Sequence, residues 1–387
     1  MLRRAIFLCA LVAALAYAGL TSAHDPSAYG GLFRSRDLGG TWLNADVGLF
    51  LGSAVALAVS PVDPNHLLLG TDANLLVSRT GGRDWRQDSP DRLFGAVTAV
   101  AFLPDGQGAL CSTPAGIFRL EHGQWRAASA PSEAAPARAI VPGGEPGRVY
   151  LLGRAELFRS DDYGREWRRV EHGLPDRAEF LELAVAPAPV ETLYANYGGK
   201  LLASADQGRT WSQRDAGLPG QAIEAITLDP AVQARLWVAS ADRVYMSEDA
   251  GRRWRPAGGM LPETGTSVRG IAADAAGRTI VLTTHRGMYR SVDGGARWTL
   301  LEGNLPVHLE AKPLVRDPGD AQTLYAGYSL MPYAEVWRIA LEGGTLLGRV
   351  DLLSLAGGLA FLLLLMLVGA LAVRRLYRGA RAGSTDR

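Results

Sequence analysis

Cysteine and lysine are almost absent from this chain of 387 residues, whose only representatives are Cys9, Cys111, Lys200 and Lys312. Cys9 lies within the apolar N-terminal stretch that is predicted below to be removed, which leaves Cys111 alone. No intrachain disulfide is then available, so the fold must be stabilised by packing. The scarcity of lysine beside abundant arginine, alanine and glycine indicates a GC-rich bacterial genome.

Recognisable sites for metals and phosphates are also missing. The six histidines are scattered, without paired spacing and without a cysteine cluster beside them. The sequence therefore predicts no metal site. It contains no Gly-x-x-x-x-Gly-Lys loop of the kind that cradles phosphates. We expect no cofactor.

Positive charge is concentrated at the two ends of the chain, whose net charge is +1. Without the two arginines at positions 3 and 4 and the net four positive charges of residues 374–387, the remainder carries a net charge of −5. A mildly acidic domain is not suited to neutralising a phosphate backbone, so nucleic acid is not an expected partner.

What the chain does have is a regular spacing of tryptophan. Seven of the nine tryptophans follow one another at steps of 40 to 44 residues. They are Trp42, Trp85, Trp125, Trp167, Trp211, Trp254 and Trp298. A fixed period in the forties is typical of a repeat architecture in which each unit is a small four-stranded sheet.

Five of these tryptophans end a Ser-x-Asp-x-Gly-x-x-Trp motif. The copies are Ser35-Asp37-Gly39-Trp42, Ser160-Asp162-Gly164-Trp167, Ser204-Asp206-Gly208-Trp211, Ser247-Asp249-Gly251-Trp254 and Ser291-Asp293-Gly295-Trp298. The copy before Trp85 has Thr80 in place of the aspartate, and the copy before Trp125 is shortened. Short Ser and Asp side chains stabilise a turn by bonding back to its backbone, and Gly supplies the positive φ. With the bulky Trp on the next strand as a packing anchor, the motif predicts a hairpin.

Upstream of each motif lie two further apolar runs separated by a turn, such as 54–59 and 67–70. Each period therefore holds four short strands, which is the content of a propeller blade. We predict an all-β, seven-bladed β-propeller of four-stranded antiparallel blades over residues 24–345.

The motif and its spacing resemble the Asp-box (BNR-like) repeat propellers. This group includes sialidases, sortilin-type receptors, some endoglucanases, and the photosystem II assembly and stability factors of chloroplasts and cyanobacteria. The recurrent Gly-Leu-Pro after the box, at 173–175 and 217–219, is most similar to the assembly-factor and sortilin branch. The resemblance implies the fold strongly and the activity weakly.

Six complete four-strand units run from about residue 54 to residue 298, so the seventh blade must be shared by both ends of the chain. Such sharing closes the ring and removes its free edges. Strand signals occur at 311–316, 324–328 and 335–339. Either 335–339 or 32–35 is expected to form the third strand of this blade.

Both ends of the chain indicate a membrane protein. Residues 1–23 have the pattern of a secretory signal peptide, with an uncleaved anchor as the alternative. Within the linker and helix predicted over 346–373, residues 352–373 form an uncharged run long enough to cross a bilayer, followed by a basic tail at 374–387. Because positive residues stay in the cytoplasm, we expect one C-terminal transmembrane helix, an extracytoplasmic propeller and a cytoplasmic C-terminus.

The repeated positions do not indicate a catalytic site. The box aspartates Asp37, Asp162, Asp206, Asp249 and Asp293 recur once per blade, so we interpret them as turn-stabilising residues rather than as an acid set. No Arg-Ile-Pro segment of the sialidase type is present. We therefore expect no enzymatic activity and assign no catalytic residue, although a pair of carboxylates across the central pore would indicate a glycosidase.

The loops between the second and third strands differ most from blade to blade and are the candidate contact sites. They contain Asp72, Asn74, Arg154, Glu156, Asn196, Tyr197, Lys200, Asp242, Arg243, His285 and Arg286, and in the longest loop Tyr328, Met331, Tyr333 and Glu335. Exposed aromatic and Met residues are enriched at protein interfaces. The longest loop is predicted either to contact a partner or to pack over the pore, and ordinary solvation is the alternative for the charged residues.

The sequence thus predicts a membrane-anchored propeller that binds another protein. The resemblance implies a role as an assembly or stability factor for a membrane complex. The alternative is a carbohydrate-active propeller, either a cell-surface glycan binder or a glycosidase.

Overall fold

The computed structural model describes residues 31–341 apart from positions 48, 50, 94, 107, 176, 177, 188, 189, 230, 233 and 241. The expected signal peptide at 1–23, the membrane span at 352–373 and the basic tail at 374–387 lie outside the described residues. Among the helices that are described, none has the length and apolarity needed to cross a membrane.

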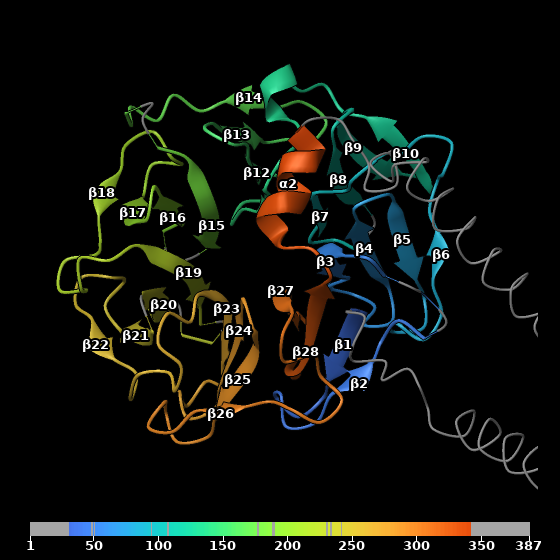
Figure 1. Ribbon diagram of the computed structural model, residues 1–387. Coiled ribbons are helices and arrows are strands. Elements are labelled where there is room, and N and C mark those ends of the chain that lie inside the picture. Colours follow the sequence, from blue (N-terminus) through green and yellow to red (C-terminus); the bar gives the residue numbers. More distant parts are fainter. Residues whose placement is uncertain are drawn as a thin grey trace, which may run out of the picture. The chain divides into compact units, whose positions relative to one another are not determined.

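Seven four-stranded antiparallel sheets are arranged around a central channel, as the sequence predicts (Figure 1). In six of them the strands follow chain order outward from the channel. These six are β3 (Ala54–Val59), β4 (Leu67–Thr71), β5 (Leu75–Ser78) and β6 (Arg86–Gln87); β7 (Ala99–Phe102), β8 (Ala109–Thr113), β9 (Gly116–Glu121) and β10 (Gln124–Ala127); β11 (Ala139–Pro142), β12 (Val149–Leu152), β13 (Leu157–Ser160) and β14 (Arg168–Arg169); β15 (Phe180–Ala186), β16 (Thr192–Tyr197), β17 (Lys200–Ser204) and β18 (Ser212–Gln213); β19 (Ile223–Leu228), β20 (Leu236–Ser240), β21 (Arg243–Ser247) and β22 (Arg255–Pro256); and β23 (Val268–Ala273), β24 (Ile280–Thr284), β25 (Gly287–Ser291) and β26 (Thr299–Leu300).

The seventh blade joins the two ends of the described chain. It consists of β27 (Glu310–Asp317), β28 (Asp320–Ser329), β1 (Gly31–Ser35) and β2 (Leu43–Asn44). Strands β1 and β28 pair over five residues, from Gly31 opposite Tyr328 to Ser35 opposite Leu324. The third strand of this blade is therefore supplied by β1, which contains residues 32–35, one of the two segments that the sequence left open for this position.

Residues 335–339, which carried a strand signal, are helical instead and belong to α2 (Tyr333–Leu341). Both edges of β28 are occupied, by β27 and β1, so no edge remains for a further strand. Val336, Trp337 and Ile339 are buried on one side of the helix, while Glu335 and Arg338 pair with each other. Trp337 is thus a helix residue. Trp237, the other tryptophan outside the regular spacing, lies in strand β20.

The periodic tryptophans pack each blade against the preceding one. Trp125 is 1% exposed, and its indole N–H donates to Asp88 of the preceding blade at 2.9 Å. The indole N–H groups of Trp85 and Trp254 donate to backbone carbonyls that lie 40 residues earlier, at 2.7 and 2.6 Å. Their role as anchors between blades is confirmed by these contacts.

The aspartate boxes form the turns between third and fourth strands. In the box at 204–211, the Ser204 hydroxyl donates to the Asp206 carboxylate and accepts from the Gly208 N–H, each at 2.8 Å. Asp206 also accepts from the backbone N–H and the hydroxyl of Thr210, at 2.9 and 2.7 Å. The same Ser–Asp and Ser–Gly bonds recur in the other four complete boxes. The turn-stabilising role predicted for these aspartates is therefore observed.

Replacing Trp125 with Ala is expected to lower the free energy of unfolding by about 3–5 kcal/mol, because it leaves a large cavity between two blades. Leu43→Ala, at a side chain of β2 that is 65% exposed, is the control and should change it by less than about 0.5 kcal/mol. Urea unfolding followed by tryptophan fluorescence measures both. Equal midpoints for the two variants would contradict the anchoring role.

Acid should weaken the box at 204–211. The two bonds from Thr210 hold the pKa of Asp206 at about 2, below its usual 3.8. A carboxylate with a lowered folded-state pKa stabilises the fold above the unfolded-state pKa, and this contribution is lost as pH falls through the folded-state value. Asp206→Asn should therefore lower the melting temperature at pH 6 and differ less from the wild type at pH 2. A difference that does not vary with pH would argue against this linkage.

Candidate functional site

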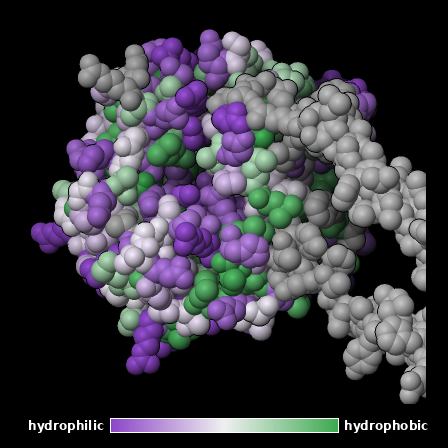
Figure 2. Space-filling view, in the orientation of Figure 1, coloured by the Kyte–Doolittle hydropathy of each residue, from purple (hydrophilic) through white to green (hydrophobic). Residues whose placement is uncertain are grey.

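The loops between second and third strands and α2 lie on one face of the propeller, the channel face, and the aspartate boxes lie on the other. Helix α2 follows directly from β28 and crosses the mouth of the central channel (Figure 1). In Figure 2, which views this face, hydrophilic side chains gather at its centre and hydrophobic ones lie beside them. The longest predicted loop therefore packs over the pore, one of the two outcomes expected of it.

The other predicted contact residues are spread around the ring instead of converging. Several of them are engaged close to their own loops. Asn74 accepts from Thr71, Asp72 accepts from Ser53, Arg154 donates to Glu179, Glu156 pairs with Arg169, Asp242 accepts from the Gly265 N–H, His285 accepts from the Ser267 N–H, and the Lys200 amine lies 4.0 Å from Asp215. Arg286 is exposed, Arg243 and Met331 are half-buried, and Glu335 pairs within α2.

Two of the predicted contact tyrosines are core residues. Tyr328 is fully buried, with its ring edge against Phe33 at a centroid distance of 5.4 Å. Tyr197 is 7% exposed and donates its hydroxyl to the Pro175 carbonyl. Asn196, also buried, donates to the Ile223 carbonyl at 2.7 Å and so links two blades. These residues position the loops and do not reach a partner.

The residues that do converge were not singled out from the sequence. They lie at the start of the first strand of each blade, where these strands line the channel. In five blades the pairing between first and second strands is irregular here, which marks a β-bulge: one residue is skipped in four blades and two in the seventh. A bulge re-aims a side chain. The skipped residues all line one cavity in the channel; they are Val55, Leu181, Glu224, Arg269, and Lys312 with Pro313.

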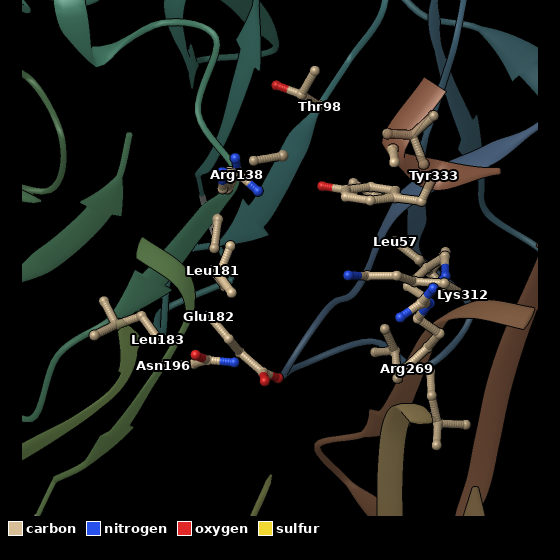
Figure 3. Close-up of a pocket in the computed structure, with 18 of the residues that line it drawn as sticks. Leu57, Thr98, Arg138, Leu181, Glu182, Leu183, Asn196, Arg269, Lys312 and Tyr333 are labelled. Atoms are coloured by element: carbon tan, nitrogen blue, oxygen red, sulfur yellow. The ribbon is translucent and has the colours of Figure 1, made fainter. Parts of the chain in front are cut away.

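This cavity has a volume of about 860 Å³ and a lining that is partly apolar and partly charged. Its aliphatic side chains include Val55 and Leu57 of β3, Ile140 of β11 and Leu181 of β15. Its charged side chains come mainly from β15, β19, β23 and β27. Tyr333 of α2 lies at the top of the cavity, and Glu182 and Lys312 extend into it from opposite sides (Figure 3).

Glu182 is the acidic group with the least engaged carboxylate. One oxygen accepts the backbone N–H of Ile226 in the next blade at 2.8 Å. Enclosure in the channel raises the pKa of the carboxyl to about 7, although the nearby Lys312 charge and the Ile226 N–H act in the opposite direction. Its charge therefore changes close to neutral pH.

The two other carboxylates of the cavity are committed to holding blades and helix together. Glu224 accepts from the hydroxyl of Ser267 and the N–H of Val268, at 3.0 and 2.9 Å. Glu310 pairs with Arg269 and accepts the N–H of Tyr333 at 2.6 Å. Among the described residues, the channel thus offers one weakly engaged carboxylate rather than a pair.

Lys312 is the central cation of the cavity. Its ammonium lies 4.2 Å from the ring centroid of Tyr333, and the structure records no carboxylate within ion-pair distance of it among the described residues. Burial in the channel wall lowers the pKa of this amine, and the positive charges of Arg269 and Arg138 act in the same direction, whereas the negative charges of Glu182 and Glu310 oppose them.

Helix α2 is held over the mouth by contacts to these same groups. The Arg138 guanidinium stacks 4.8 Å from the Trp337 ring and donates to Glu179 at 2.6 Å. The Tyr333 N–H bond to Glu310 fastens the first turn of the helix. Helix α2 is therefore bonded directly to charged residues that line the cavity beneath it.

Metal binding finds no support in the described part of the chain, where no group of three or more His, Cys, Asp or Glu side chains is placed to hold an ion. Cys111, the cysteine within the described range, is buried in β8 and free.

Comparison with known proteins agrees with this architecture. The family model described as photosynthesis system II assembly factor YCF48 matches residues 118–302, which is slightly less than half of the chain. This chain is a BNR-like, Asp-box repeat propeller. No curated protein matches its sequence.

Solved structures resemble this Asp-box propeller in fold. YCF48 from Cyanidioschyzon merolae is 16% identical, with a TM-score of 0.56 over 73% of this chain and 97% of that one. A structure of YCF48 bound to D1 peptide is 17% identical, with a TM-score of 0.54 over 72% and 94%. The GH74 xyloglucanase from Xanthomonas campestris is 20% identical, with a TM-score of 0.57 over 75% of this chain and 55% of that enzyme. At these identities the likeness establishes the fold alone.

The raised pKa of Glu182 predicts a pH-dependent stability of this propeller. An acid whose folded-state pKa exceeds its unfolded-state value costs stability as pH rises from about 4.5 through 7. Glu182→Gln removes this cost, so the variant should unfold at higher urea concentration than the wild type at pH 8 and not at pH 4.5. Urea midpoints at the two pH values measure the effect. Parallel pH profiles for the two proteins would refute the raised pKa.

Proposed function

We propose that this propeller is a binding platform for another protein and serves as an assembly or stability factor for a membrane complex. The observation that carries the proposal is the match of residues 118–302 to the family of photosynthesis system II assembly factor YCF48. A YCF48 with a similar fold has been solved with D1 peptide bound, which supports a polypeptide as the kind of ligand.

The channel face is the side on which we place the partner. The opposite face consists largely of the repeated box turns, whose side chains are used to hold the turns. On the channel face the sequence varies between blades, and α2 has no counterpart in the other blades described. Met260 and Leu330 are exposed on this face, at 56% and 43%. Exposed apolar side chains of this kind favour protein contacts.

A membrane location is part of the proposal. It rests on the signal-like residues 1–23, the uncharged run at 352–373 and the arginines that follow it. The propeller would then stand outside the cytoplasm, where the lumenal or extracytoplasmic part of a membrane complex is accessible to it.

A glycan-active propeller remains the second candidate because the xyloglucanase shares the fold. The cavity supports it less well. Glycosidases need two placed carboxylates. Each of the three here already accepts a backbone N–H or pairs with an arginine, and Glu224 and Glu310 each make two such or similar contacts. Tyr333 is the single aromatic ring among the described cavity residues, which gives little surface for stacking a sugar.

Site-specific crosslinking in the native membrane tests the protein-binding proposal. The full chain would carry a photo-crosslinking amino acid in place of Leu330 or Met260 on the channel face. We expect both positions to recover the same protein by mass spectrometry, since both would lie within one interface.

Val62 and Val292 on the opposite face, each 61% exposed, are the matched control positions. They should give no such product. Equal recovery from both faces, or no specific product from the channel face, would overturn the proposal.

A further inference from the structure

We infer that the cavity in the channel binds a small molecule with a carboxylate attached to an apolar body, and that Lys312 holds the carboxylate. This site goes beyond the proposed protein platform, since the ligand would lie inside the ring rather than on its outer face. Four observations carry the inference: a cation outside any recorded ion pair, two further hydrogen-bond donors, aliphatic side chains lining the same cavity, and a volume suited to a small molecule.

This cation is Lys312. Arg269 is paired with Glu310, and Arg138 is paired with Glu179 at 2.6 Å. The amine of Lys312 lies against the Tyr333 ring and takes part in no recorded ion pair among the described residues, and the negative charges of Glu182 and Glu310 act on it from farther away (Figure 3). A buried charge without a close counter-charge is costly, and an anion bound at this point would relieve the cost.

Two further donors are available beside the amine. The Nε of Arg138 is fully buried and has no hydrogen-bond acceptor among the described residues. The Tyr333 hydroxyl points into the cavity, and burial raises the pKa of this phenol so that it keeps its proton. A planar carboxylate accepts several hydrogen bonds at once, and charge-assisted ones are the strongest of these.

The aliphatic side chains that line the cavity define the rest of the ligand. Val55, Leu57, Ile140 and Leu181 present aliphatic surface to the cavity. Small-molecule sites usually combine such surface with a few placed polar groups, in volumes of roughly 300–1,000 Å³. The observed volume of about 860 Å³ lies within this range, and it accommodates a compact organic acid.

Binding should strengthen as the pH falls from 8 to 6. Glu182, with a pKa of about 7, loses the charge that would repel the carboxylate. The charged and titratable groups that face this point are Glu182 of β15, Glu224 of β19, Arg269 of β23, Glu310 and Lys312 of β27, Arg138 before β11, and Tyr333 of α2. The described cavity residues of β3 and β7 are uncharged.

Isothermal titration calorimetry of the purified full chain in detergent tests the inference. The probe is 4-phenylbutyrate, which has a carboxylate on an apolar body, and it is compared with 4-phenylbutyramide and with glucuronate. We expect binding of the first, with an affinity at least about tenfold above that of the amide, which lacks the charge, and of glucuronate, which has a polyol body. The affinity should be several-fold higher at pH 6 than at pH 8.

Three variants assign the effect to residues. Lys312→Met should weaken binding at least about tenfold, Lys312→Arg should restore part of it, and Glu182→Gln should reduce the difference between pH 6 and pH 8. Arg126→Met removes an exposed cation of the outer strand β10 and is the matched control for charge. Thermal melting establishes that each variant is folded.

Three results would overturn the inference. Equal affinity for the acid and the amide would show that no carboxylate site exists, and an unchanged affinity in folded Lys312→Met would show that Lys312 does not hold the ligand. Absence of binding by all probes at millimolar concentration would also reject it. None of these results bears on the crosslinks from Leu330 and Met260, so this inference and the proposed function can fail separately.

Discussion

The pairing of β1 with β28 is the constraint on which this structure depends. It joins residues almost 300 positions apart and closes the ring. Because of it, β1 and β28 each have a hydrogen-bonded neighbour on both edges, and no free edge remains between them. Closure also fixes the distance of every first strand from the channel axis. The cavity, its charged side chains and the position of α2 all follow from a ring of seven blades, because a different number would change the width of the channel.

The two faces of the closed ring differ in chemical variety. On one face the box turns repeat the same Ser–Asp–Gly hydrogen bonds, which stabilise the hairpins, so this face is chemically uniform. The other face receives α2 directly from β28, and the helix is fastened there by Glu310 and Arg138. The proposed interaction surface and the internal cavity thus lie at the same end of the channel.

Much of the fold could be predicted from residue patterns, and the errors have physical causes. The tryptophan spacing and the boxes gave the blades because each box is a local structure, complete within eight residues. Residues 335–339 were predicted as a strand from their apolar content alone. Both edges of β28 are already paired, so these residues cannot join the blade, and they form a helix that buries Val336, Trp337 and Ile339. The membrane span and the signal peptide remain predictions.

The sequence by itself determined the repeat, the blade content and the turn-stabilising role of the aspartates, since each depends on residues close together in the chain. The cavity was decided by the tertiary structure. Glu182 and Lys312 are 130 residues apart, and nothing in either local sequence marks them. They face each other because the β-bulge that aims Lys312 arises from strand register, and because seven blades bring their first strands around one channel. Register and closure are properties of the whole ring, so no local pattern reveals them.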